Sequence, residues 1–100
     1  MDEQQQVADF IQKHELRDDP AFRILDLSAE VGEIAADATK STSMGVSPDE
    51  LAVPSDEVGD ALFSLLAVAE SLDIDAGDAL DEALEKYRNR IEETGSAFSA

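Results

Sequence analysis

The chain has 100 residues, with 24 acidic and 7 basic side chains, a formal net charge of −17 and no cysteine. This length supports one domain around a single modest core. The charge excludes binding to nucleic acid or to an anionic membrane through general electrostatics, because phosphate groups would be repelled, and the lack of cysteine excludes disulfides and thiolate metal sites.

The first predicted element is a helix over residues 2–15. Val7, Phe10 and Ile11 have the spacing of one helical face, which indicates an amphipathic helix, and residues 4–6 are expected to face solvent. Asp19 and Pro20 then have the residue types of an N-cap and a first helical position. Residues 1–19 are therefore predicted to be an N-terminal helix and turn.

A second helix is predicted from Pro20 to Lys40. At 100° per residue, Glu30, Glu33 and Asp37 fall on a strip beside the apolar stripe, at the edge of the core. Gly32 weakens a helix here by about 1 kcal/mol, which indicates a close approach by another backbone or a ligand. The expected apolar stripe consists of Ile24, Leu27, Val31, Ile34, Ala35 and Ala38.

Residues 41–54 interrupt the helical pattern with a cluster of Ser, Thr, Gly and Pro. A capping-box sequence at residues 47–50 predicts one short helical turn inside this loop. A loop of this length either covers a site or is only a long crossover between helices.

A third helix is predicted from Ser55 to Leu72. Residues 61–69 are apolar nearly all round, which is typical of a central, buried helix. Glu57 and Asp60 open this helix, and two carboxylates on so apolar an element need partners, because burying an unpaired charge is prohibitive.

The fourth predicted helix runs from Ala76 to Glu93 behind an Asp75 N-cap. Gly95 ends it, and residues 95–100 are expected to be a loose tail. We therefore predict a single all-α domain over residues 1–100, a small four-helix bundle with one long crossover loop. The apolar seam of the fourth helix is expected to consist of Ala76, Leu80, Ala83, Leu84, Tyr87 and Ile91.

Two carboxylate pairs have matching spacing in this arrangement: Glu30 with Glu33, and Glu57 with Asp60. Residues three apart lie on one helical face, so two such pairs turned toward each other would surround one small volume. Such a cluster repels itself unless divalent cations bind inside it. The alternative interpretation is a solvated acidic face.

With both pairs placed, the chain resembles the MazG-like all-α nucleotide pyrophosphohydrolases. The resemblance rests on residues 27–35 and 56–67, which hold the ExxE and ExxD motifs, on residues 72–80, and on the basic ending at residues 86–90. It implies hydrolysis of the α–β phosphate bond of nucleoside triphosphates, giving a monophosphate and pyrophosphate.

The resemblance also implies roles for individual residues. Mg²⁺, or Mn²⁺ in its place, would be held by Glu30, Glu33, Glu57 and Asp60, with Glu33 a candidate base. Lys40, Lys86 and Arg90 become candidate phosphate ligands. A homodimer or homotetramer is expected, since family sites are usually completed across such an interface. The aromatic side chains Phe10, Phe22, Phe63 and Tyr87 are all explicable as core, so none is assigned to a base.

Two other classes of function stay open: a non-catalytic helical interaction module, and a metal-binding accessory protein with the same fold. The acidic excess predicts a halophilic source, since the Debye length falls to about 3 Å in molar salt and surface charges then scarcely repel. The chain is expected to be cytoplasmic, because residues 1–6 lack the features of a signal peptide and the longest apolar run is about half a membrane span.

Overall fold

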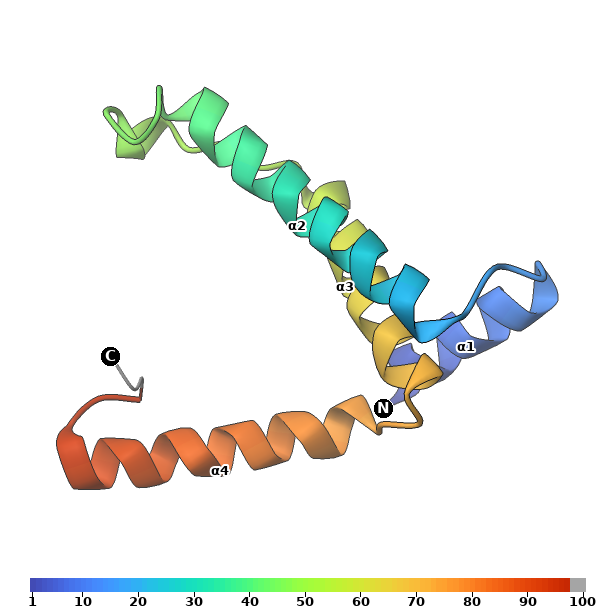
Figure 1. Ribbon diagram of the computed structural model, residues 1–100. Helices are drawn as coiled ribbons and strands as arrows, with labels where there is room; N and C mark the ends of the chain where they lie inside the picture. Colours follow the sequence, from blue (N-terminus) through green and yellow to red (C-terminus); the bar gives the residue numbers. More distant parts are fainter. Residues whose placement is uncertain (98–100) are drawn as a thin grey trace.

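The computed structural model describes residues 1–97, and all regular secondary structure among them is helical, with no strand (Figure 1). This confirms the predicted all-α class and the four helices. Residues 98–100 of the expected tail lie outside the described residues. The elements are α1 (Asp2–Lys13), α2 (Pro20–Ser41), the short 3₁₀ turn η1 (Pro48–Glu50), α3 (Ser55–Ser71) and α4 (Ala76–Thr94).

The helix ends have the chemistry that the sequence predicts. The Asp19 carboxylate accepts a hydrogen bond from the Phe22 backbone N–H at 3.3 Å, and Asp75 accepts one from the Asp78 N–H at 2.9 Å. Each cap satisfies a backbone donor that has no partner inside the helix. Gly95 ends α4 in the left-handed region, with φ of 78°, where glycine carries no steric penalty.

Helix α3 is the common partner of α1 and α2. It runs beside α2 through most of its length, and α1 crosses near its C-terminal end (Figure 1). The buried core between α1 and α3 consists of Val7, Ile11, Leu66 and Ala67. This core is small, as expected for a chain of this length.

Gln4 joins α1 to the turn between α3 and α4. Its side-chain amide donates to the Ile74 carbonyl at 2.8 Å and to Glu70 at 3.1 Å, and its carbonyl accepts from the Ala76 N–H at 2.7 Å. Gln4 is buried, so the expectation that it faces solvent is wrong. An amide supplies both a donor and an acceptor, which is what the unpaired backbone groups of this turn require.

Helix α4 extends away from the other three helices (Figure 1). The radius of gyration is 16.5 Å, compared with about 13 Å for a compact chain of this length. Consequently α4 has no buried residue, and Leu80, Leu84 and Ile91 of its predicted seam are 52%, 40% and 52% exposed. We call these three side chains, with Ala83 and Tyr87, the apolar face of α4.

The other helices also leave apolar side chains uncovered. Leu62 and Leu65 of α3 are exposed, so the expectation that α3 is buried on all sides is wrong for the single chain. Ile24 and Val31 of the expected α2 stripe are exposed as well. The physical reason is that α4, which would cover such faces in a closed bundle, lies elsewhere.

Gly32 is not explained by packing within the chain. A Cβ atom added there, or at Gly59, would meet no described atom within 4 Å. The expected close approach by another backbone is therefore wrong for residues 1–97. No helix in this part of the chain is both long and apolar enough to cross a membrane.

Candidate metal centre

The seam between α2 and α3 is lined with acidic side chains. On α2, Asp26, Glu30, Glu33 and Asp37 follow one another at intervals of four, three and four residues, which places them along one helical face. Helix α3 lies alongside and begins with the second predicted pair. We call this region the α2–α3 seam.

Three carboxylates of the seam converge. Glu30, Glu33 and Asp60 each offer an oxygen, and these oxygens all lie within 4.8 Å of one another. Glu30 is half-buried, while Glu33 and Asp60 are exposed. These three residues, the carboxylate cluster, bring together both members of the first predicted pair and one member of the second.

The cluster is electrostatically unfavourable without a cation. Desolvation raises the pKa of Glu30, and the neighbouring charges of Glu33, Asp60 and Asp26 raise it further. Each of these effects disfavours the ionised form. A bound cation would reverse the charge contribution, because it favours ionised carboxylates.

Glu57, the fourth predicted ligand, is not part of this group of three. Its carboxyl group lies against Asp37, and one oxygen of each, Glu57 Oε2 and Asp37 Oδ2, is shielded from solvent and has no hydrogen-bond donor as long as both groups are ionised. A proton on Glu57 removes the repulsion between the two groups. The pKa of Glu57 is accordingly raised to about 7. The largest cause is hydrogen bonding to Asp37, followed by desolvation and then by the charges of Asp37 and Glu33.

Asp26 lies at the other end of the seam and is held by two neighbours. Ser64 Oγ donates to Asp26 Oδ2 at 3.0 Å, and Arg23 Nη1 is 3.8 Å from the same oxygen. Arg23 is only 4% exposed, and its guanidinium lies near the rings of Phe22 and Phe63. The buried cation partly compensates the acidic seam.

Sequence reasoning did not assign a site role to Asp26 or Arg23. The signal for Asp26 was present, because it continues the row of Glu30, Glu33 and Asp37 one turn toward the start of α2. No comparable signal marked Arg23, since an arginine in the first turn of a helix is usually solvated.

The predicted phosphate ligands are not gathered at the cluster in this chain. Lys40 is exposed near the end of α2, ten residues from Glu30, which corresponds to roughly 15 Å along the helix. Lys86 and Arg90 are on α4, which extends away from the seam (Figure 1). Lys86 Nζ lies 5.5 Å from the centre of the Tyr87 ring.

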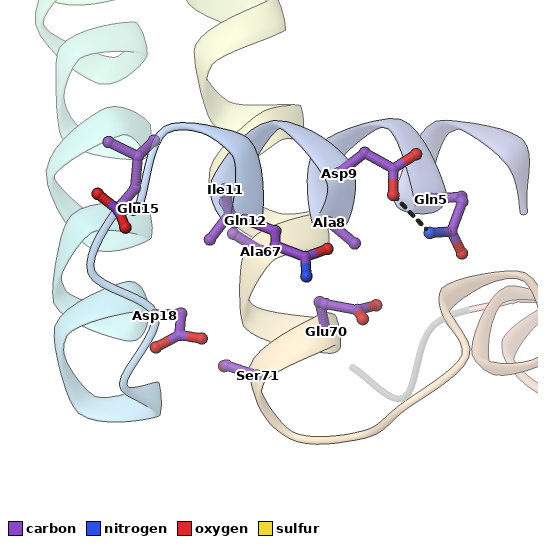
Figure 2. Close-up of a pocket in the computed structure, with 11 residues that line it drawn as sticks. Gln5, Ala8, Asp9, Ile11, Gln12, Glu15, Asp18, Ala67, Glu70 and Ser71 are labelled. Atoms are coloured by element: carbon purple, nitrogen blue, oxygen red, sulfur yellow. Dashed lines mark hydrogen bonds between the residues drawn. The ribbon is translucent and has the colours of Figure 1, made fainter.

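A second acidic region lies between α1 and the end of α3, apart from the carboxylate cluster. A cavity of about 520 Å³ lies there. Asp9, Glu15, Asp18 and Glu70 are among the residues that line it (Figure 2). Glu70 is held by Gln4 of α1. It therefore belongs to this cavity and is not one of the converging carboxylates.

The donor set of the cluster suits a hard divalent cation. Mg²⁺ and Ca²⁺ prefer carboxylate oxygens, and Mg²⁺ keeps several waters when protein supplies only a few ligands. Oxygens bound to one Mg²⁺ lie at most about 4.2 Å apart, twice the metal–oxygen distance. Because the oxygens of the cluster lie within 4.8 Å of one another, their side chains would need to move inward only slightly to bind one Mg²⁺.

A family model described as the MazG nucleotide pyrophosphohydrolase domain matches residues 1–94. The chain belongs to the MazG family. The match includes α1, which precedes all of the motifs that carry the resemblance. Searches of curated proteins and of solved structures find no match.

The α2–α3 seam lies within the residues that the family model matches. Both motifs lie within the matched residues, one on α2 and one on α3. Three of their four acidic positions are the converging carboxylates.

Proposed function

We propose that this MazG domain is a divalent-metal-dependent pyrophosphohydrolase that cleaves nucleoside or deoxynucleoside triphosphates between the α and β phosphates. The observation that carries the proposal is the convergence of Glu30, Glu33 and Asp60 from two helices in a chain of this family. Mg²⁺ is the expected ion, with Mn²⁺ as a substitute, since both accept carboxylate oxygens.

Glu30, Glu33 and Asp60 would hold the metal, and Glu57 would join them when it is ionised. A divalent ion supplies binding of the phosphates and neutralisation of the charge that develops on them. The glutamate pair on α2 keeps its carboxylates one turn apart on a continuous helix, which fixes their spacing before substrate binds.

Glu33 is the candidate base. It is exposed and can therefore reach a water molecule beside the substrate. In the proposed reaction its carboxylate accepts a proton from the attacking water as the water oxygen bonds to the α-phosphorus. The bond from that phosphorus to the bridging oxygen breaks, and pyrophosphate leaves with the bonding electrons.

Lys40, Lys86 and Arg90 are the proposed phosphate contacts. Because α4 extends away from the seam of its own chain, Lys86 and Arg90 would serve the seam of another copy. The uncovered apolar face of α4 and the uncovered side chains Leu62 and Leu65 of α3 support a homodimer or homotetramer. The proposed site is thus shared between copies.

The deciding experiment measures products from a panel of ribo- and deoxynucleoside triphosphates in molar KCl, with Mg²⁺, with Mn²⁺ and with EDTA. Metal-dependent release of pyrophosphate and monophosphate is expected. Orthophosphate alone would indicate a different phosphatase chemistry. Metal binding without turnover would favour a metal-binding accessory protein, and neither binding nor turnover would favour a non-catalytic interaction module.

A halophilic source is part of the proposal, supported by the net charge of −17. Screening by salt should reduce repulsion among the acidic side chains. The melting temperature is therefore expected to rise between low salt and molar KCl. Equal stability at both concentrations would contradict this assignment.

A further inference from the structure

The direction of α4 is set at the turn that joins it to α3. The extensive helix–helix contacts among residues 1–97 are those that α1 and α2 make with α3, and α4 has no buried residue. The first residue of α4, Ala76, packs against the buried core. Beyond it the helix extends away from the other three (Figure 1), so within one chain its direction depends on the geometry of residues 72–76.

The backbone of this turn is fixed on the α3 side. The Ile74 N–H donates to the Ala69 carbonyl at 2.9 Å, which closes the end of α3, and Asp73 has a left-handed backbone with φ of 55°. Aspartate adopts this conformation more readily than most residues. On the α4 side, the Ala76 N–H opens the helix, where the helix itself supplies no acceptor.

One side chain of α1 joins the two sides of the turn. The Gln4 amide donates to the Ile74 carbonyl at 2.8 Å and accepts from the Ala76 N–H at 2.7 Å. Its nitrogen also donates to Glu70 of α3 at 3.1 Å. An amide nitrogen carries two hydrogens and its oxygen accepts, so all three bonds form together. Gln4 is 7% exposed, and its planar amide therefore fixes three points: the last turn of α3, the connecting turn and the start of α4.

Lys86 and Arg90 are far enough from this turn for small changes of direction to matter. They lie ten and fourteen residues beyond Ala76, which corresponds to roughly 15 and 21 Å along the helix. A change of about 20° in the direction of α4 would therefore displace them by roughly 5 and 7 Å. Hydrogen bonds to oxygen vary in length by only about 0.5 Å, so a displacement of this size removes such a contact.

We propose that Gln4 is a positioning residue for the phosphate-binding cations, because its amide fixes the direction in which α4 leaves α3. This inference rests on the proposed function, in which Lys86 and Arg90 serve the seam of another copy. The carboxylate cluster lies on α2 and α3 and does not depend on the turn. Loss of the Gln4 hydrogen bonds should therefore weaken substrate binding and leave metal binding intact.

The first test measures the direction of α4 in the full-length protein by pulsed electron paramagnetic resonance. The chain has no cysteine, so Ala36→Cys on α2 and Asn89→Cys on α4, both at exposed positions, can carry spin labels. Dilution with unlabelled protein removes distances between copies. Wild type should give one narrow distance distribution. Gln4→Met, which keeps the length of the side chain and loses its hydrogen bonds, should give a broader or shifted one.

A matched control and a rescue variant accompany this measurement. Gln5 is exposed and bonds to Asp9 within α1, so Gln5→Met should leave the distribution as in wild type. Gln4→Glu should broaden the distribution, because it brings a carboxylate against Glu70. Adding Glu70→Gln restores a donor and an acceptor at this contact and should narrow the distribution again. Circular dichroism shows whether helicity is retained in each variant.

The second test separates positioning from general stability. Gln4→Met should raise the KM for a nucleoside triphosphate about 10-fold, as expected for the loss of one hydrogen bond between charged groups. The affinity for Mg²⁺, measured by calorimetry without nucleotide, should stay the same. A general loss of structure would instead weaken Mg²⁺ binding as well.

Two results would overturn the inference. The first is an identical distance distribution in wild type and Gln4→Met, which would mean that the amide does not direct α4. The second is an unchanged KM in a Gln4→Met protein whose distribution has changed, since the direction of α4 would then not matter for substrate binding. Absence of turnover in wild type would defeat the proposed function separately, because the distance measurement needs no substrate and still decides whether Gln4 directs α4.

Discussion

The α2–α3 seam and the apolar face of α4 are both unfavourable surfaces in the single chain, for opposite reasons. The seam brings like charges together, with Glu30, Glu33 and Asp60 oxygens within 4.8 Å. The apolar face of α4 holds leucine and isoleucine side chains in solvent. Both arrangements are unfavourable in free energy, because like charges in a partly desolvated site repel and apolar side chains in water stay hydrated. Both surfaces are unfavourable in the single chain, and the proposed function places a cation at the seam and a second copy against α4.

The largest effect should come from removing charge at the seam. Glu57→Gln with Asp60→Asn is expected to lower turnover by more than about 100-fold, since metal ligands matter at least as much as the groups that orient them. The same double variant should raise the melting temperature in EDTA, because it relieves repulsion. Calorimetry and pyrophosphate release measure the two effects.

The matched control is Glu82→Gln on α4, an exposed carboxylate away from the seam. It should change neither activity nor stability appreciably. Normal turnover by the double variant would refute the site assignment.

A charge on the apolar face of α4 should produce the next largest effect. Leu84→Glu is expected to shift the oligomer to a smaller species and weaken association by more than about 10-fold, because it places a charge in an apolar contact. Light scattering with gel filtration measures the mass, and circular dichroism shows whether helicity is retained. Glu85→Ala is the neighbouring control, and an unchanged mass for Leu84→Glu would mean that α4 is not the interface.

How much of this arrangement the sequence could predict depends on the range of the interactions. Helix bounds and caps came out correctly, because Asp19, Asp75 and Gly95 act on backbone groups within a few residues. Glu30 and Glu33 were placed together for the same reason. The sequence could not show that Asp37 would meet Glu57, that Phe10, expected in the core, would be 48% exposed, or that α4 would leave the other helices. Those outcomes depend on which face meets which, and helical periodicity does not specify the partner of a face.

Stability without metal should depend on pH through Glu57. Its pKa is raised from 4.5 to about 7, so the folded protein retains a proton that the unfolded chain loses at lower pH. The stabilisation from this group is present below about pH 4.5 and is lost as the pH rises through about 7. Melting curves in EDTA at constant salt should therefore show a falling melting temperature across this window.

Two variants isolate that contribution. Glu57→Gln should remove this part of the pH dependence, and Asp37→Asn should reduce it, because Asp37 is the first cause of the shift. Saturating Mg²⁺ should also flatten the curve if Glu57 joins the metal site. An equal slope in wild type and Glu57→Gln would show that the Asp37–Glu57 contact does not form in solution.

The smallest expected effect is on stability, from replacing either of two N-cap aspartates by alanine. Asp19 caps α2, which is packed against α3, and Asp75 caps α4, which is not. Asp19→Ala should lower the free energy of unfolding by about 1 kcal/mol.

The effect of Asp75→Ala should depend on whether α4 has its proposed partner. In a Leu84→Glu background, where α4 lacks that partner, Asp75→Ala should increase only the hydrogen exchange of α4 amides, since opening α4 disrupts little else. In the oligomer, Asp75→Ala should also lower global stability, because α4 would then be part of the folded unit. Equal global destabilisation by both caps in the Leu84→Glu background would mean that α4 is coupled to the other three helices within one chain, and that the two surfaces are not independent.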